Sequence, residues 1–383
     1  MSSAALLPPV WVDTPKGLAH LAAVLAAQSV IAVDTESNSL HAYRERVCLI
    51  QFSTATADYL LDPLALPDLS ALAPPMADPA IEKIFHASEY DLICLRRDFG
   101  WKVKPLFDTM VAARTLGLPQ MGLAALLETY FNVKMNKRHQ RADWAQRPLL
   151  PDQVDYARMD THFLIPLRAR LAAQLQAKGC WAEAAEEFER LTQMDGAAAA
   201  EFDAASFWRV SGARDLTPRQ AAILRELYVY RESVARRLDR PPFKVMSEAT
   251  LMALAQATVH TANDLKAMPG MTDGQIRRHG AQIVQAVARG RQAPVQRPPR
   301  AERHDEALLD RYDRLRRWRK QKAQERGVES DVIMPREVLW ALAGAGPQSL
   351  AELERVTELG PVRRAKYGQE ILEVLSKKGK HGA

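Results

Sequence analysis

The sequence is poor in cysteine and has no long apolar run. Its three cysteines, Cys48, Cys94 and Cys180, lie far apart, and no Cys-x-x-Cys pair occurs. This spacing argues against a disulfide framework and against a cysteine-based zinc site. No apolar stretch approaches the roughly 20 residues that a membrane-spanning helix needs. The amino terminus lacks the basic start of a secretory signal, so we expect no membrane association and a reducing, cytoplasmic setting.

The composition is otherwise ordinary for a soluble globular protein. Hydrophobic residues make up 47% and charged residues 26% of the 383 residues, and this length suits two or three domains. The formal net charge is +6, and the sequence pI is about 9.2. A basic balance favours a polyanionic partner such as nucleic acid, although many basic proteins bind none.

The first half of the chain alternates between strand and helix patterns. Short runs of apolar and β-branched residues predict strands at Val30–Asp34, Val47–Phe52, Asp58–Asp62 and Lys83–His86. Helical spacing of apolar residues predicts helices over residues 18–27, 88–98, 107–117, 121–131 and 151–175. This mixture predicts an α/β domain with a central sheet.

Two segments have the composition of linkers. Met194–Ala205 is made of small residues with little periodicity, and Arg289–Arg300 is rich in proline and arginine. Between and beyond these two segments the chain has only helical patterns, so we expect small helical domains there.

The helical half of the chain contains an internal repeat. Lys244–Ala255 matches Val332–Ala343 at an offset of 88 residues. The same offset, without a gap, pairs Tyr230 with Trp318 and Arg231 with Arg319. We therefore expect two copies of one small helical domain.

Three short patterns in the chain place acidic side chains at regular positions. Asp34 and Glu36 are two residues apart in a strand, so both side chains project from one face. Asp91 lies in the first turn of a helix, and Tyr156 and Asp160 share one helix face. Each pattern alone also fits an ordinary structural role, such as a strand end in solvent or a helix-dipole partner.

Taken together, the four acids and the tyrosine suit the hydrolysis of a phosphodiester. This reaction needs an activated water and stabilisation of charge on an anionic phosphate, and two divalent ions about 3.5–4 Å apart supply both. Hard cations such as Mg²⁺ and Mn²⁺ prefer carboxylate oxygens to Cys or His. The acids therefore indicate a metal-dependent nuclease if the fold brings them together.

The same motifs, in this order, resemble a known enzyme family. The segments VDTES (33–37), HASEYDL (86–92) and YARMD (156–160) resemble the DEDD 3′–5′ exonucleases of the tyrosine subtype, which have a ribonuclease H-like fold. The segments 105–117 and 137–149 resemble ribonuclease D, and the repeated tail resembles the HRDC domain. Two such tail domains behind a DEDD exonuclease are the layout of bacterial ribonuclease D.

The resemblance implies an α/β ribonuclease H-like exonuclease domain followed by two small all-α HRDC-type domains. We expect the exonuclease domain over residues 1–193 and the helical domains over residues 206–290 and 302–380. The implied activity is that of a 3′–5′ exoribonuclease that releases 5′ mononucleotides, with a role in the 3′ maturation of tRNA precursors and other structured RNAs. The implied partner is RNA with a single-stranded 3′ end, and we expect a monomer.

The resemblance also assigns roles to the five site residues. It implies that Asp34, Glu36, Asp91 and Asp160 bind two divalent ions, Mg²⁺ or Mn²⁺, and that Tyr156 orients the attacking water. On the working hypothesis, Asp34 and Asp160 hold the ion on the nucleophile side, and Glu36 and Asp91 complete the cage. The family often has a bulky apolar residue after the motif glutamate, whereas this chain has Ser37, which affects how the terminal base is packed.

Further residues are candidates for holding the substrate. They are His86, the stretch Lys137, Arg138, Gln140 and Arg141, and the basic residues Arg316, Arg317 and Arg319. A strand-end histidine, a solvated loop and a charged exposed helix are the alternative interpretations of these segments. Asp108 is interpreted as a helix cap, or as a group that supports the site from outside it, rather than as a fifth catalytic acid.

Two other functions stay open at this point. The DEDD core also serves DNA exonucleases, and the ribose contacts that separate RNA from DNA cannot be identified in the sequence. A non-catalytic nucleic-acid-binding module is a third possibility, but all four acids and the tyrosine are present.

Overall fold

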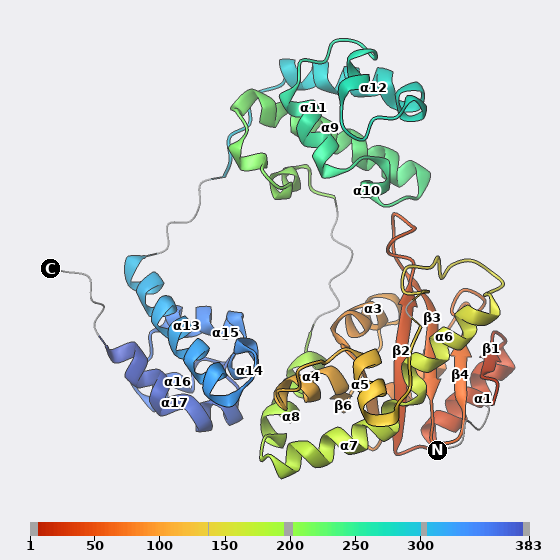
Figure 1. The fold of residues 1–383 in the computed structure, drawn as a ribbon, viewed down its shortest axis with the longest axis vertical. Coiled ribbons are helices and arrows are strands. Elements are labelled where there is room, and N and C mark those ends of the chain that lie inside the picture. The colour runs from red at the N-terminus through yellow and green to blue at the C-terminus, as the bar shows by residue number, and fades with distance from the viewer. Residues whose placement is uncertain (1–6, 137, 195–201, 300–304, 378–383) are drawn as a thin grey trace. The chain divides into compact units, whose positions relative to one another are not determined.

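The computed structural model describes residues 7–136, 138–194, 202–299 and 305–377, which Figure 1 shows as a ribbon. The chain divides into two compact units. The first unit contains residues 1–36, 47–198 and 303–383, and the second contains residues 37–46 and 199–302.

A six-stranded mixed sheet forms the centre of the first unit. The strands are β1 (Val10–Val12), β2 (Val30–Ser37), β3 (Val47–Ser53), β4 (Asp58–Leu61), β5 (Glu82–Phe85) and β6 (Leu106–Asp108). Their order is β1-β4-β3-β2-β5-β6, and β3 pairs antiparallel with β4 whereas β5 runs parallel to β2 and β6. All seven residues of β3 are buried, as expected for an inner strand. The four predicted strands are confirmed; β1 and β6 were not predicted, because three residues carry too little periodicity.

Eight α-helices accompany the sheet in the described part of the chain before residue 195. They are α1 (Pro15–Ala26), α2 (Ala73–Ala77), α3 (Glu89–Phe99), α4 (Thr109–Thr115), α5 (Leu123–Phe131), α6 (Pro151–His162), α7 (Leu164–Ala177) and α8 (Trp181–Thr192), with a 3₁₀ turn at Ser70–Leu72. Two predicted boundaries were wrong. The helix expected over 151–175 is interrupted at Phe163, and the one expected over 107–117 begins only after β6 because Asp108 caps α4.

The helical half of the chain consists of two copies of one arrangement. The first copy has α9 (Pro218–Leu238), α10 (Pro242–Val245), α11 (Glu248–Gln256) and α12 (Asp273–Gln292), preceded by 3₁₀ turns at Ala204–Arg209 and Ala213–Asp215 and interrupted by one at Asp264–Ala267. The second copy has α13 (Glu306–Arg326), α14 (Ser330–Ile333), α15 (Arg336–Ala345), α16 (Leu350–Leu353) and α17 (Pro361–Ser376). Both ends of α9 and α13, and of α10 and α14, differ by 88 residues. The predicted repeat is confirmed.

An equivalent arginine in each copy makes the same hydrogen bond to a backbone carbonyl. The guanidinium of Arg231 donates to the carbonyl of Met246 at 3.4 Å, and that of Arg319 donates to the carbonyl of Met334 at 2.9 Å. Met246 and Met334 are themselves related by the offset of 88 residues. Trp318 is buried in the core of its copy.

The second predicted linker began too early. The helix α12 continues through Arg289 and ends at Gln292. Gly290 has no side chain, so this last part of α12 packs directly against the backbone of Ile223 on α9. Residues 195–201 of the first predicted linker, and Arg300 of the second, lie outside the described residues. The three domain bounds expected from the sequence stay a prediction.

The structure also bears on two expected absences. None of the three cysteines forms a disulfide, and all three are buried. Within the described ranges, no helix combines the length and the apolar character needed to cross a membrane.

Candidate active site

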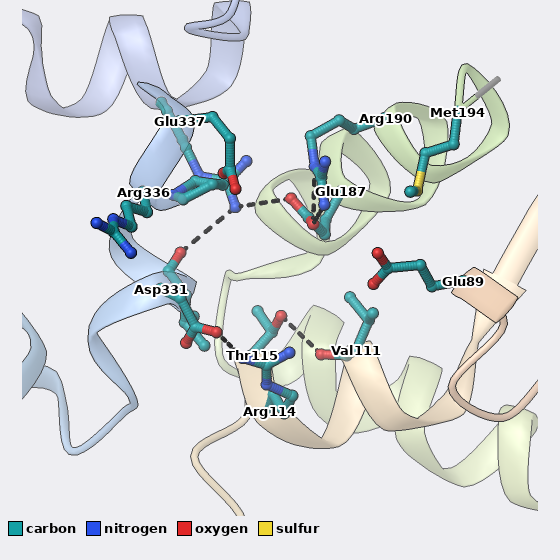
Figure 2. A pocket seen from close by; sticks show the side chains of 13 residues that line it. Glu89, Val111, Arg114, Thr115, Glu187, Arg190, Met194, Asp331, Arg336 and Glu337 are labelled. Carbon is teal, nitrogen blue, oxygen red and sulfur yellow. Dashed lines mark hydrogen bonds and ion pairs between the residues drawn. The ribbon is translucent and has the colours of Figure 1, made fainter. Parts of the chain in front are cut away.

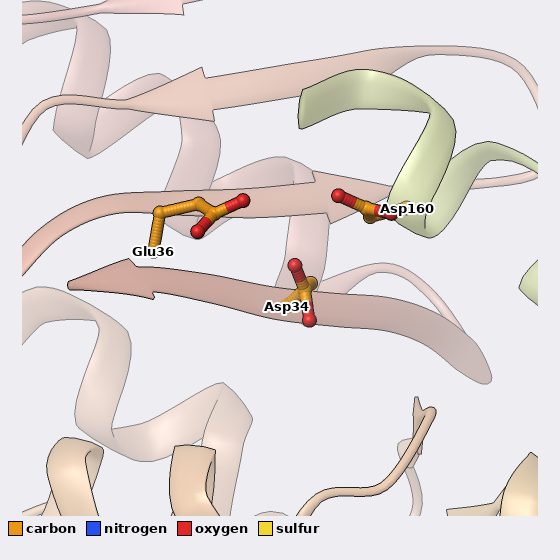
Figure 3. A group of neighbouring side chains, drawn as sticks. All are labelled: Asp34, Glu36 and Asp160. Atoms are coloured by element: carbon orange, nitrogen blue, oxygen red, sulfur yellow. The ribbon is translucent and has the colours of Figure 1, made fainter. Parts of the chain in front are cut away.

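Three of the four motif acids converge at the middle of the sheet. Asp34 and Glu36 project from β2, and Asp160 projects from α6, which packs against β3 and β4. Each offers a carboxylate oxygen, and these oxygens lie within 4.8 Å of one another. Figure 3 shows the three side chains pointing toward a common point. The fold therefore brings together three of the acids whose convergence the sequence left open.

The fourth acid, Asp91, lies beside this group and is bound by Thr35, the residue between the two acids of β2. Its carboxylate accepts a hydrogen bond from the amide of Thr35 at 3.1 Å and another from the Thr35 hydroxyl. Asp91 is outside the three-acid ligand group, but its negative charge raises the pKa of Asp34, Glu36 and Asp160. Thr35 was not identified from the sequence, because its partner is 56 residues away.

Burial and the charges of neighbouring carboxylates act on all four acids, and for Asp91 that neighbour is Asp108. Burial is the largest cause that raises the pKa of Asp34 and Glu36 well above their ordinary values, and the neighbouring carboxylates add to it. Burial likewise raises the pKa of Asp91 and Asp160 to about 7. Such a cluster of oxygen ligands is stable in its charged form only with cations, and all-oxygen ligands suit Mg²⁺ or Mn²⁺.

Tyr156 lies one helical turn before Asp160 and is fixed by aromatic neighbours. Its ring centroid is 5.9 Å from that of the buried Trp144 and 6.1 Å from that of His139. Burial, followed by the charges of Asp160, Glu36 and Asp34, raises the pKa of the Tyr156 phenol. The hydroxyl therefore stays neutral and can orient a water by hydrogen bonding. Trp144 had no assigned role in the sequence, because only the fold places it under Tyr156.

The turn between β5 and α3 carries His86 and leads into Asp91. Ala87 in this turn has a φ of 60°, a left-handed conformation that is unfavourable for alanine. The buried carboxylate of Asp108 holds the turn, because it accepts from the amides of Ala87 at 3.1 Å and Ser88 at 2.7 Å. The same carboxylate caps α4, so Asp108 is both the predicted helix cap and a group that supports the neighbouring turn.

His86 is half-buried and has a defined hydrogen-bond partner. Its Nδ1 lies 2.9 Å from the hydroxyl of Thr109, and that hydroxyl donates to the carbonyl of Phe85 at 3.0 Å. Because the single Thr109 proton is used, Nδ1 of His86 is the donor and Nε2 is an acceptor in the neutral ring. Burial lowers the pKa of His86, which favours this neutral form.

The remaining predicted substrate residues are not equivalent. Arg138, Gln140 and Arg141 are exposed, and Lys137 lies outside the described residues. On α13, Arg316 and Arg317 are exposed, and Arg316 forms an ion pair with Asp313 at 3.1 Å. Arg319 is half-buried and bound to the Met334 carbonyl, so it serves its own domain and is a poor candidate for an RNA contact.

A separate pocket lies between the exonuclease helices and α14–α15, and Figure 2 shows its lining. Its lining is balanced in charge, with four arginines and four acids, and several of these are paired. Arg114 bonds Asp331, Arg190 bonds Glu187 at 2.7 Å, and Arg363 bonds Glu187 at 3.3 Å. The ion pairs of Arg114 and Arg363 join the exonuclease helices to the second helical copy within the first unit. The lining does not present the excess of positive charge that a nucleic acid requires.

Comparison with known proteins places these features in a wider context. The model of a 3′–5′ exonuclease family matches residues 9–176, and that of the HRDC domain matches residues 220–287 and 309–375. Ribonuclease D of Pseudomonas paraeruginosa is 30% identical, over 95% of this chain and 97% of its own length. The crystal structure of Escherichia coli RNase D, described as an exoribonuclease involved in structured RNA processing, is similar with a TM-score of 0.70 and 25% identity, over 96% of this chain and 99% of that one.

A further relative is larger than this chain. The exosome complex exonuclease RRP6 of Saccharomyces cerevisiae is 36% identical over 70% of this chain. The chain spans 38% of that protein and 19% of RRP6-like 3 of Arabidopsis thaliana. These relatives therefore contain regions with no counterpart in the chain.

The repulsion between the acids predicts that the metal-free protein is stabilised when one acid is neutralised. The folded-state pKa values of Asp91 and Asp160, about 7, lie above their ordinary value of 3.8. Their contribution to stability is therefore fully present below about pH 4 and is lost as the pH rises through 7. We expect Asp34→Asn to raise the unfolding temperature in EDTA at pH 8 by roughly 2–6 °C, and to have little effect at pH 4.

The control for this prediction is Glu373→Gln, which neutralises an exposed acid on α17. Thermal unfolding of both variants in EDTA and in Mg²⁺ gives the comparison. Mg²⁺ should stabilise the wild type more than Asp34→Asn. Equal shifts for the two variants at pH 8 would contradict the account.

The position of Asp108 predicts an indirect effect on metal binding. In Asp108→Asn one acceptor oxygen becomes an NH₂ group, so the Ala87–Ser88 turn loses part of its support. We expect about a 10- to 100-fold increase in the Mg²⁺ concentration for half-maximal activity, together with faster hydrogen exchange at the Ala87 and Ser88 amides. Asp203→Asn, which alters a cap whose carboxylate accepts from the Ala205 amide within the described part of the chain, is the control and should change neither quantity.

Proposed function

The chain belongs to the ribonuclease D family of 3′–5′ exoribonucleases, and from this premise we propose that it removes 5′ mononucleotides from RNA 3′ ends by two-metal hydrolysis. The convergence of Asp34, Glu36 and Asp160 supports this proposal most directly, because their oxygens form a hard-cation site next to Tyr156. RNA with a single-stranded 3′ end is the proposed substrate, with tRNA precursors as its natural source. That the enzyme acts as a monomer, in the cytoplasm, stays a prediction.

The four acids have distinct proposed roles. Bound Mg²⁺ or Mn²⁺ ions lower the pKa of water and stabilise the charge that develops on the leaving 3′ oxygen. Asp34 and Asp160 would hold the ion on the side of the attacking water, and Glu36 and Asp91 would complete the cage. The hydrogen bonds from Thr35 fix the carboxylate of Asp91 beside the two β2 acids.

Tyr156 has the role of positioning the attacking water. Its neutral hydroxyl lies beside Asp160, and the packing against Trp144 and His139 limits the motion of its ring. A fixed hydroxyl aligns a water with the phosphorus without itself gaining charge.

His86 is the proposed contact to the terminal nucleotide. With its Nδ1 proton directed at Thr109, Nε2 is left as an acceptor that can receive a hydrogen bond from a ribose hydroxyl. Arg138 and Gln140, on the exposed loop before α6, and Arg316 and Arg317 on α13 are proposed phosphate contacts. Lys137, which lies outside the described residues, stays a prediction from the sequence.

Substitution of the site residues tests this function. Asp34→Asn should lower the rate of hydrolysis of a 3′-labelled single-stranded RNA in Mg²⁺ or Mn²⁺ by about 10²-fold or more, because it removes a metal ligand. Tyr156→Phe should lower kcat by a similar factor and leave RNA affinity in EDTA unchanged. Tyr130→Phe is the matched control, because the Tyr130 hydroxyl bonds only Gln174 among the described contacts.

Hydrolysis at the wild-type rate by Asp34→Asn would show that the site assignment is wrong. The same assay with a DNA strand of equal sequence separates an exoribonuclease from a DNA exonuclease. Binding of both strands without metal-dependent hydrolysis of either would instead indicate a non-catalytic module.

A further inference from the structure

Two buried acids flank the strand β4 and lie on the same face of it. Asp58 begins the strand and Asp62 directly follows it, and the two residues are 8% and 4% exposed. Alternation along a strand places Asp58, Leu60 and Asp62 on one face, with about 13 Å between the two acids. Leu60 packs with Trp144 and with Ala157 of α6, so this is the face against which α6 lies (Figure 1). Neither acid belongs to the three-acid group, and the proposed mechanism leaves both without a role.

Asp62 fixes the segment that leads into α6. Its carboxylate accepts two hydrogen bonds from the guanidinium of Arg147, at 2.6 and 2.8 Å. The same guanidinium donates to the carbonyl of Trp144 at 2.8 Å and to that of Cys48 on β3 at 2.7 Å. Arg147 therefore ties the segment that carries Trp144 to β3 and to the end of β4. Because the Trp144 ring packs against that of Tyr156, a shift of this segment would release the Tyr156 ring.

Asp58 fixes the other end of α6. Its carboxylate accepts a hydrogen bond from the Ser53 hydroxyl at 2.6 Å, and its second oxygen lies 2.8 Å from Nδ1 of His162, the last residue of α6. Oγ of Ser53 also lies 2.7 Å from the hydroxyl of the buried Thr161. Because the single Ser53 proton is directed at Asp58, Thr161 is the donor in this contact. The last turn of α6, which contains Asp160, is thereby bound to β3 and β4.

The two sets of contacts supply geometry more than stability. Burying an ion pair such as Asp62 with Arg147 has a large desolvation cost, and apolar side chains of equal volume often stabilise a fold as well or better. A bidentate contact between a guanidinium and a carboxylate instead fixes both distance and direction. The side chains that lie between the two fixed ends of α6 include Tyr156 and Asp160, whose placement decides the geometry of the site.

We propose that Asp58 and Asp62 are positioning residues, each of which fixes one end of α6 relative to the sheet. Asp62 sets the orientation of the Tyr156 ring, and with it the alignment of the attacking water. Asp58 sets the position of the Asp160 carboxylate, and with it the affinity of the site for divalent ions. The proposal rests on the proposed function, since it takes Tyr156 and Asp160 as parts of the hydrolytic site.

A double-mutant cycle tests the role of Asp62. Asp62→Asn should lower kcat for a 3′-labelled RNA about 10-fold in the wild-type background but less than about 2-fold in the Tyr156→Phe background, because residues that act as a unit have non-additive effects. Arg147→Lys keeps the charge but loses the bidentate geometry, so it should behave in the same way.

Fluorine NMR of the protein labelled with fluorotyrosine gives a second readout, which does not depend on hydrolysis. The signal that disappears in Tyr156→Phe belongs to Tyr156. This signal should shift or broaden in Asp62→Asn and in Arg147→Lys, because the ring is no longer held in one orientation. An unchanged signal in both variants would overturn the role of Asp62.

Direct binding of Mn²⁺ in the absence of RNA tests the role of Asp58. Asp58→Ala and Ser53→Ala should each weaken Mn²⁺ binding about 10-fold, because the end of α6 that carries Asp160 is no longer fixed. Ser53→Ala is the milder change and keeps the test valid if Asp58→Ala does not fold, which thermal unfolding shows. Wild-type Mn²⁺ affinity in the folded variants would overturn the role of Asp58.

Glu82→Gln is the matched control for these variants. Glu82 on β5 accepts a bidentate contact of the same kind, at 2.6 and 2.9 Å, but from Arg168 of α7. Its replacement should leave kcat, the fluorine signal of Tyr156 and the Mn²⁺ affinity close to those of the wild type. Equal losses of kcat in Glu82→Gln and Asp62→Asn would overturn the proposal, because any contact between a strand and a helix would then have the same effect.

The failure of this proposal is distinguishable from the failure of the proposed function. Hydrolysis at the wild-type rate by Asp34→Asn would remove the proposed function. Loss of hydrolysis in Asp34→Asn and Tyr156→Phe, together with an Asp62→Asn effect of equal size in both backgrounds of the cycle, would overturn the positioning role of Asp62 alone.

Discussion

The clustering of four carboxylates, one buried and three partly buried, is the constraint on which the structure of the site depends. Burial is the largest cause that raises the pKa of Asp34, Glu36, Asp91 and Asp160; the charge of Asp91 adds to it for the other three acids, and that of Asp108 adds to it for Asp91. A protein keeps such a cluster only if cations relieve it or if the surrounding fold holds it against the strain. On the proposed function, metal ions would relieve this cluster, and the fold supplies the rest of the support.

That support comes from backbone groups and from packing outside the cluster. Thr35 binds Asp91 from within β2, and Asp108 fixes the left-handed turn at Ala87 through which β5 leads into α3. On the opposite side, Trp144 holds the ring of Tyr156. Each of these contacts joins segments distant in the sequence, so the geometry of the site follows from the whole α/β domain rather than from any one motif.

Much of the fold, and the choice of acids that the fold brings together, could be predicted from the sequence, because both depend on local patterns. Strand alternation indicated β2, helical spacing indicated the Tyr156 face, and the constant offset indicated the repeat. Contacts between distant segments could not be predicted: Thr35 with Asp91, Trp144 with Tyr156, and Arg319 with a carbonyl of its own domain. The repeat predicts that the two copies share one core, but it does not predict the side chains on their surfaces, which differ. The exposed fractions of the side chains in the structure are needed to tell core residues from surface residues.

The stoichiometry and mutual distance of bound Mn²⁺ ions test the central claim most directly. Titration of the full chain with Mn²⁺, followed by electron paramagnetic resonance in the presence of a non-hydrolysable RNA 3′ end, measures both. The account predicts two ions per chain with the spectrum of a coupled pair, and the loss of that spectrum when Glu36 is replaced by Gln. A single isolated ion, or a coupled pair that is unaffected by Glu36→Gln, would contradict it.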